Sequence, residues 1–150
     1  MKGESERRRA SGFVCVRGDG ALLLLRDARA GHWGIPKGYQ DPADASRFAC
    51  GRREAREELG PISLLVVAGY RREIEYQVRA RGGWPEHPKS LLCYLALWPE
   101  GRCPQLSHEH DRWRFVQPSE LADYVPYPEL RGLLEEAVRV ARRHLEQREP

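Results

Sequence analysis

The sequence lacks any apolar run that approaches the roughly 18 consecutive residues of a membrane-spanning helix. Its first residues also contain no apolar segment of the kind found at the centre of a secretory signal. No internal repeat or low-complexity segment is present. These absences exclude a helical membrane protein and a repeat protein, and we expect one ordinary domain that stays unexported in the cytoplasm.

Cysteine is also scarce, and its spacing does not match the common zinc motifs. The four cysteines are Cys15, Cys50, Cys93 and Cys103, and no two of them form a C-x-x-C pair. They fall mainly inside apolar stretches, where cysteine is usually a small buried residue. We therefore expect reduced, buried thiols, as in cytoplasmic proteins, and neither a zinc site nor a cysteine nucleophile.

The charge balance shows no strong excess of either sign. The formal net charge is +3 and the isoelectric point is about 8.8. Most of the surplus lies in the first ten residues, at Lys2, Arg7, Arg8 and Arg9. A short basic end of this kind is usually solvent-facing chain. We therefore expect residues 1–10 to form a disordered tail and residues 11–147 to form a single domain, whose charge is compatible with an anionic ligand.

The pattern of apolar residues predicts a fold of the α/β class. Strands are expected over residues 12–16, 21–25, 62–68, 71–78, 90–98 and 113–116. The first two are separated by Gly-Asp-Gly at residues 18–20, a typical hairpin turn. One helix is expected after Gly38, and another begins near Pro128, where apolar residues repeat at helical spacing as far as Leu145. Such an order predicts a sheet packed against helices.

A compact cluster of carboxylates lies on the helix expected after Gly38. Glu54, Glu57 and Glu58 are spaced i, i+3 and i+4, so a helix projects all three from one face. Like charges at this spacing repel by only about 0.2 to 0.5 kcal/mol per pair. The glutamates are interleaved with Arg52, Arg53 and Arg56. Such a mixture of charges equally suits a solvated helix face with surface salt bridges. The alternative is a hard divalent cation, which would turn the repulsion into a binding site.

The residues around this cluster resemble the Nudix hydrolase family. That family's signature is Gly-x5-Glu-x7-Arg-Glu-aliphatic-x-Glu-Glu-x-Gly-aliphatic, and its places are filled by Gly38, Arg53, Glu54, Ala55, Glu57, Glu58 and Gly60. The first acidic position holds Asp44, followed by eight residues instead of seven before the arginine, and Pro61 replaces the last aliphatic residue. Because of the extra residue, we expect Asp44 to cap the helix and not to bind metal.

The resemblance implies a Nudix-type α/β/α sandwich with a mixed sheet, and hydrolysis of a pyrophosphate bond. Water attacks phosphorus in line in such a reaction, and catalysis depends on positioning and on charge neutralisation by metal ions. The implied metal is Mg²⁺, with Mn²⁺ as a substitute, because both favour oxygen ligands. The implied ligands are Glu54, Glu57, Glu58 and the Gly38 carbonyl. Glu54 or Glu57 would act as the general base, while Arg53 orients the carboxylates.

Three segments outside the signature resemble the asymmetrical diadenosine tetraphosphate hydrolases within the family. They are residues 32–38, 69–76 and 106–113. By this resemblance Glu109 is a further metal ligand or base, with a solvated loop residue as the alternative. His108 and His110 flank this glutamate, but a zinc site would need a second pair of ligands, and the sequence has none at a suitable spacing. We therefore expect the two histidines to make loop hydrogen bonds.

The same resemblance indicates substrate-binding residues. Lys37 and Lys89 are expected to contact phosphate oxygens, although a surface lysine is the alternative for Lys89. Tyr76 and Trp113 are expected to clamp a base, since stacking on an aromatic ring contributes about 1 to 3 kcal/mol per base. Ordinary core aromatics are the alternative for this pair.

The expected reaction is therefore Mg²⁺-dependent hydrolysis of a nucleoside polyphosphate, namely diadenosine tetraphosphate to ATP and AMP. Related enzymes with the same signature act on RNA 5′ ends or on diphosphoinositol polyphosphates, and these substrates remain alternatives. A non-catalytic Nudix-like module that binds nucleotides is an alternative of another class, motivated by the extra residue before Arg53. The sequence indicates neither a membrane partner nor an obligate protein partner.

Overall fold

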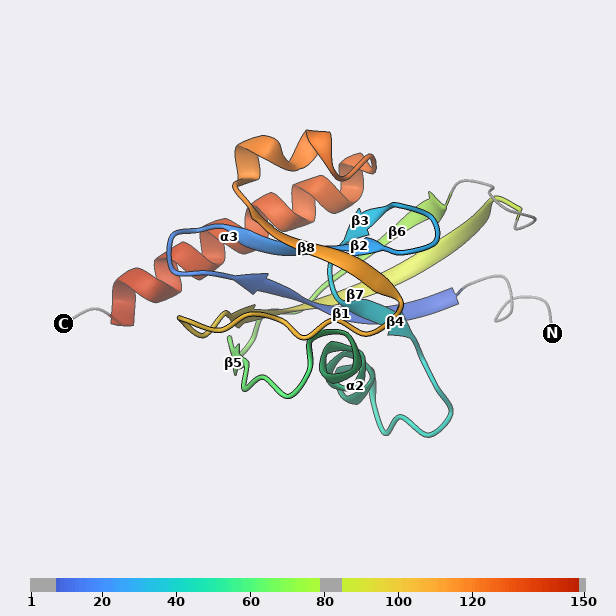
Figure 1. Cartoon of the computed structure of the whole chain (residues 1–150), viewed down its shortest axis with the longest axis horizontal. Helices are drawn as coiled ribbons and strands as arrows, with labels where there is room; N and C mark the ends of the chain where they lie inside the picture. Colours follow the sequence, from blue (N-terminus) through green and yellow to red (C-terminus); the bar gives the residue numbers. More distant parts are fainter. Residues whose placement is uncertain (1–7, 79–84, 149–150) are drawn as a thin grey trace.

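The computed structural model describes residues 8–78 and 85–148, and in this part a sheet lies between helices (Figure 1). Its strands are β1 (Arg8–Val16), β2 (Leu22–Asp27), β3 (Trp33–Gly34), β4 (Lys37–Tyr39), β5 (Leu65–Val66), β6 (Arg72–Val78), β7 (His87–Leu97) and β8 (His110–Val116). Its helices are α2 (Arg47–Leu59), the 3-10 helix η1 (Pro118–Asp123) and α3 (Pro128–Arg148). The expected α/β/α sandwich is confirmed.

The sheet is mixed, with β1 and β7 at its centre. These two strands run parallel, in register from Arg8 opposite Lys89 to Val16 opposite Leu97. The remaining pairings in the described ranges are antiparallel: β2 and β4 pair with β1, β5 and β6 with β7, and β3 and β8 with β2. Both central strands are covered on each face, which is why they read as continuous apolar runs in the sequence.

The turn between β1 and β2 has the predicted position, but the two strands separate directly after it. Gly20 has a φ of 88°, a left-handed conformation that favours glycine. The strands pair at Val16 and Leu22, and farther along β4 lies against β1 while β3 lies against β2. The segment with β3 and β4 therefore enters between the strands and brings Lys37 and Gly38 into contact with α2.

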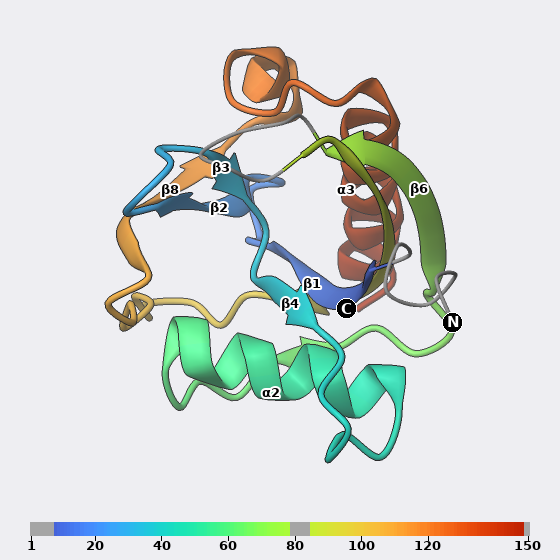
Figure 2. The same cartoon turned by 90° about the vertical axis from the view of Figure 1, so that its right-hand side faces the viewer.

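Side chains on the two faces of the sheet form separate apolar clusters. The α3-side cluster includes the buried residues Val14, Leu24, Leu91 and Leu134. The α2-side cluster includes Phe13, Leu23, Ala55 and Leu59. Neighbouring residues of β1 and β2 enter opposite clusters, as the period of two in a strand requires. Figure 2 shows α2 and α3 on opposite sides of β1. No helix in the described ranges has both the length and the apolar character that crossing a membrane requires.

Two sequence-based boundaries differ from the structure. Residues 8–10, which we assigned to the tail, begin β1, because they pair in parallel with the start of β7. Residues 1–7 lie outside the described part of the chain. The strand expected over 62–68 is reduced to β5, since Ile62 and Leu64 pack against the α2-side cluster instead of extending the ladder.

The cysteines are free thiols, and most are buried. Cys15, Cys50 and Cys93 are buried as expected, whereas Cys103 is exposed in the loop before β8. Burial raises the pKa of the Cys15 and Cys93 thiols to about 12. Neither thiol therefore offers a thiolate nucleophile near neutral pH.

Candidate active site

Helix α2 carries the three glutamates and begins after a serine cap. The Ser46 side chain accepts a hydrogen bond from the Ala49 N–H over 3.0 Å, which identifies Ser46 as the N-cap. At the other end Gly60, with a φ of 83°, donates its N–H to the Arg56 carbonyl over 3.0 Å. The prediction that Asp44 caps the helix is wrong, because its carboxylate has a different partner.

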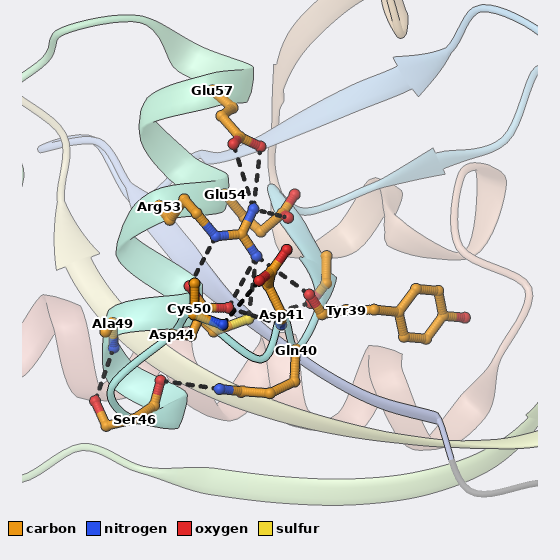
Figure 3. Close-up of polar contacts among 12 residues, drawn as sticks. Tyr39, Gln40, Asp41, Asp44, Ser46, Ala49, Cys50, Arg53, Glu54 and Glu57 are labelled. Carbon is orange, nitrogen blue, oxygen red and sulfur yellow. Dashed lines mark hydrogen bonds and ion pairs between the residues drawn. The ribbon is translucent and has the colours of Figure 1, made fainter. Parts of the chain in front are cut away.

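That partner is Arg53, which lies at the centre of a carboxylate network (Figure 3). Its Nε and Nη2 donate to the two oxygens of Asp44 over 2.8 and 3.0 Å, and its Nη1 donates to Glu54 over 2.8 Å. Nη1 also lies 3.3 Å from both Glu57 oxygens, and Nη2 donates to the Tyr39 carbonyl over 3.2 Å. This two-point pairing lowers the pKa of Asp44 to about 2. Asp44 therefore fixes Arg53, and Arg53 holds Glu54.

The pairing with Arg53 gives Asp44 a role despite its departure from the family signature. Aspartate is one methylene shorter than the usual glutamate, and the chain has one extra residue before Arg53. The Asp44 side chain nevertheless meets the guanidinium and is only 5% exposed. The shorter side chain and the longer connection together preserve a carboxylate partner for the arginine.

Replacing Asp44 with asparagine should lower kcat by about 10- to 100-fold, the usual cost of losing a partner that orients a metal-site residue. The variant removes the negative charge of the carboxylate that holds the Arg53 guanidinium at two points. Because this carboxylate is not proposed to contact the substrate, KM should change less than kcat. Steady-state kinetics would compare it with Asp123→Asn, which alters an exposed aspartate of η1. Equal kcat values in the two variants would contradict this role for Asp44.

The Glu54 carboxylate lies against the backbone of Gly38. A Cβ on Gly38 would come 2.0 Å from Glu54 Cδ, so a larger residue at this place in β4 would displace the carboxylate or the strand. Burial raises the pKa of Glu54, the charge of Arg53 opposes the rise, and the charges of Glu57 and Glu109 add to it. A half-buried carboxyl with a raised pKa is suited to accept a proton near neutral pH.

Glu58 is a buried residue of the site, at 4% exposed. One of its oxygens accepts the backbone N–H of Lys37 over 2.9 Å, and the other lies 3.3 Å from Nε2 of His110. Burial raises the pKa of Glu58 to about 8, opposed by the charge of Lys37 and reinforced by the charges of Glu54 and Glu109. A cation bound beside these carboxylates would relieve their electrostatic cost.

In metal-free protein, the free energy of unfolding should fall as the pH rises from about 4.5 to about 8. The folded-state pKa of Glu58 lies above its ordinary value, so the folded state holds this proton more tightly than the unfolded chain does. Mg²⁺ binds the ionised carboxylate, so it should raise the melting temperature more at high pH than at low pH. Thermal unfolding of the wild type and Glu58→Gln across this range tests the effect. An identical pH dependence in both proteins would exclude Glu58 as its source.

The predicted ligand set fits a hard divalent cation by its chemistry. It offers carboxylate and carbonyl oxygens, the donors that Mg²⁺ and Mn²⁺ prefer. The charge of Glu109 raises the pKa of both Glu54 and Glu58, so these carboxylates repel one another across one region. The Glu57 side chain is 56% exposed, so an ion can approach its carboxylate from solvent. Within residues 8–78 and 85–148, no three acidic, histidine or cysteine side chains are already arranged to hold an ion.

The structure brings both predicted phosphate-binding lysines to β4. Lys37 lies on β4 itself, and its charge acts on Glu58 and on His110. Nζ of Lys89 lies 4.9 Å from the centre of the Tyr39 ring. Tyr39 also accepts the hydrogen bond from Arg53 described above, so its backbone and its ring link the carboxylate network to Lys89.

The two predicted clamp aromatics lie on opposite faces of the sheet. Tyr76 is 8% exposed within the α3-side cluster, and its ring centre lies 4.7 Å from that of Tyr127. Trp113 is 39% exposed, and its ring centre lies 5.9 Å from that of Phe115, which packs against the α2-side cluster. The structure therefore does not bring Tyr76 and Trp113 together around one base.

Three contacts of this site were not anticipated from the sequence. They are Asp44 with Arg53, His110 with Glu58, and Tyr39 with Lys89. In each contact the two residues lie on different segments of the fold, so neither the spacing of a helix nor that of a strand predicts that they meet. A signal existed for Tyr39, because it directly follows Gly38 of the signature.

Known proteins match both the sequence and the fold. The NUDIX domain pattern matches residues 6–137. The bis(5'-nucleosyl)-tetraphosphatase [asymmetrical] of Mus musculus is 30% identical over 118 residues, which cover 77% of this chain and 76% of that protein. The Caenorhabditis elegans protein of the same name is 28% identical over 115 residues, covering 75% and 78%. A crystal structure of a C. elegans Ap4A hydrolase binary complex has a TM-score of 0.73 and 28% identity, covering 85% of this chain and 93% of that one.

The matched region contains every strand of the described ranges, all of α2 and the first part of α3, and therefore all the glutamates of the site. The signature residues lie where the sequence resemblance requires them, on β4, on α2 and at its end. Motif, fold and relatives thus agree. The chain belongs to the NUDIX domain family, as an enzyme that hydrolyses pyrophosphate bonds.

Proposed function

We propose that this enzyme hydrolyses dinucleoside polyphosphates with Mg²⁺, and that it cuts diadenosine tetraphosphate to ATP and AMP. The observation that carries the proposal is the half-buried Glu54 carboxylate beside Glu57 and Glu58 on one helix. Support for the substrate comes from the relatives of mouse and C. elegans, each named bis(5'-nucleosyl)-tetraphosphatase [asymmetrical].

The proposed chemistry assigns a separate task to each group of α2. Bound Mg²⁺ supplies charge neutralisation at the phosphates. Glu54 accepts the proton of the attacking water, because it has a raised pKa and is held in place by Arg53. The water oxygen bonds to phosphorus as the P–O bond to the leaving nucleotide breaks. The groups that would hold the ion are Glu57, Glu58, Glu109 and the Gly38 carbonyl.

The proposed substrate contacts surround these carboxylates. Lys37 and Lys89 would neutralise phosphate charge as compact ammonium groups. Tyr39 on β4 and Trp113 on β8 are each 39% exposed, so each offers a ring face on which a base can stack. Tyr76 is 8% exposed and packs against Tyr127, so we assign it no stacking role. Two separate stacking surfaces suit a substrate with two bases.

A substrate panel tests this proposal. Purified protein is incubated with Mg²⁺ and diadenosine tetraphosphate, 5′-triphosphorylated RNA, a diphosphoinositol polyphosphate or a nucleoside triphosphate. We expect the highest kcat/KM for diadenosine tetraphosphate. A higher value for RNA or for the inositol compound would replace the proposed substrate class. Nucleotide binding with no turnover of any compound would instead indicate a non-catalytic module.

Trp113→Ala should raise KM for diadenosine tetraphosphate by roughly 5- to 150-fold, the equivalent of about 1 to 3 kcal/mol of lost stacking. Because Trp113 lies away from the reacting phosphorus in this proposal, kcat should change little. The control substrate is adenosine 5′-tetraphosphate, which lacks the second base. An equal rise in KM for both substrates would argue against stacking of a second base on Trp113.

A further inference from the structure

A bulge at the start of β8 sets the direction of the His110 side chain. β8 pairs with β2 so that Arg112 lies opposite Arg26, while His110 lies opposite the adjacent Asp27. Asp111 is therefore an extra residue in β8, and its carboxylate pairs with Nη1 of Arg26 at 2.6 Å. A bulge of this kind breaks the alternation of a strand and redirects the neighbouring side chain.

The redirected His110 ring lies against a carboxylate of α2. Its Nε2 is 3.3 Å from Oε1 of Glu58, and the two side chains are only 13% and 6% exposed. The second oxygen of Glu58 accepts the Lys37 N–H from the start of β4. Glu58 is thus contacted from two strands that lie apart in the sheet, so its carboxylate has little freedom to rotate. The other ring nitrogen of His110, Nδ1, is buried without a hydrogen-bond partner among the described residues.

The same contact ties the segment that contains Glu109 to the helix. This segment is attached at its start, where the Gln105 N–H donates to the Leu59 carbonyl over 2.8 Å. It is attached again where the Glu109 carbonyl accepts the Ala28 N–H over 2.8 Å. The Glu109 side chain remains exposed, yet its charge acts on Glu58. His110, the next residue, joins this segment to Glu58 directly.

We infer that His110 is a positioning residue for the divalent cation. Its Nε2 fixes the Glu58 carboxylate, and its attachment to α2 keeps Glu109 within reach of the same ion. This inference rests on the proposed function, because it assigns Glu58 and Glu109 as metal ligands. Partners that orient metal ligands typically contribute 10- to 100-fold in metal affinity. A histidine that merely packed in the core would affect folding stability but would not couple two carboxylates to an ion.

The test measures the binding of Mn²⁺ alone, in the absence of substrate, from the electron paramagnetic resonance signal of the free ion. His110→Leu removes the nitrogen that contacts Glu58 and should weaken Mn²⁺ binding by about 10- to 100-fold. His110→Gln restores a nitrogen donor and should remain within about threefold of the wild type. His108→Leu changes an exposed histidine two residues earlier and should leave the affinity unchanged. Circular dichroism and melting temperature establish that each variant is folded.

The outcomes separate this inference from the proposed function. Unchanged Mn²⁺ affinity in folded His110→Leu, or equal weakening in the leucine and glutamine variants, would overturn the role of His110 alone. Weakened binding in the leucine variant supports it even if diadenosine tetraphosphate proves not to be the substrate. If His110→Leu does not fold, the test rests on His110→Gln. A loss of Mn²⁺ affinity greater than tenfold in the folded glutamine variant would contradict the inference. Absence of Mn²⁺ binding in the wild type would overturn both proposals.

Discussion

Glu54→Gln is expected to lower kcat by about 10²- to 10⁴-fold, the range that general-base catalysis contributes. Glutamine keeps the size of the side chain beside Gly38 but cannot accept a proton from water. Steady-state kinetics with diadenosine tetraphosphate would show a large loss in kcat and a smaller change in KM. Burial raises the pKa of Glu54, so this carboxyl is a better candidate for the general base than the exposed Glu57.

The matched control for this variant is Glu135→Gln, which removes an exposed carboxylate from α3. It should leave kcat unchanged and show that the loss does not come from a change in net charge. A Glu54→Gln enzyme with more than about a tenth of wild-type kcat would rule out Glu54 as the base, since such a loss falls below the usual contribution of a base.

Gly38→Ala is expected to remove most activity and to lower the free energy of unfolding by about 1 to 3 kcal/mol, as overpacking of a close contact does. The added Cβ would meet Glu54 Cδ at 2.0 Å, so either β4 or the carboxylate must move. Displacement of Glu54 would disturb its bond to Arg53 as well. Chemical denaturation and kinetics on the same preparations measure both effects.

Two further variants identify the source of the Gly38→Ala effect. Gly132→Ala adds a methyl group to α3 where nothing lies within 4 Å, and it should be neutral or stabilising. The double variant Gly38→Ala with Glu54→Asp withdraws the carboxylate by one methylene. It should recover part of the stability but not the activity. If the double variant is no more stable than Gly38→Ala, the strain has another origin.

The strands and helices that follow strong local patterns could be predicted from the sequence. The long apolar run of β7 and the helical repeat of α3 are correctly placed, because burial on defined faces leaves a periodic signature. β3 and β4 were not anticipated as strands. They are two and three residues long, and their pairing depends on the separation of β1 and β2. Their positions are determined by tertiary pairing and not by local propensity.

In the candidate site, too, local patterns could be predicted from the sequence and contacts between distant residues could not. The spacing of Glu54, Glu57 and Glu58 was sufficient to place all three on α2, since a helix fixes the relation of nearby residues. The partner of Asp44 could not be predicted, because an aspartate ahead of a helix suits capping as well as pairing with a distant guanidinium. The contact between His110 and Glu58 depends on a bulge, and a bulge shifts the strand register in a way that alternation does not reveal.

The aromatic residues show how sheet geometry limits sequence reasoning. Tyr76 and Trp113 both belong to segments that resemble one subfamily, but sequence alone did not establish which face each side chain takes. Tyr76 pairs in register with Lys89 on β7, and Trp113 pairs with Leu25 on β2. Tyr76 lies in the α3-side cluster, whereas Trp113 is exposed beside Phe115 on the other face of the sheet, so the two rings cannot form a single clamp.

Product analysis after incubation with diadenosine tetraphosphate and Mg²⁺ tests the proposed reaction most directly. Chromatography of the wild-type reaction should show ATP and AMP in equal amounts, and EDTA should abolish both products. Formation of two molecules of ADP would contradict asymmetric cleavage at this site. Cleavage that persists undiminished in EDTA would contradict the role of a divalent cation held by the α2 carboxylates.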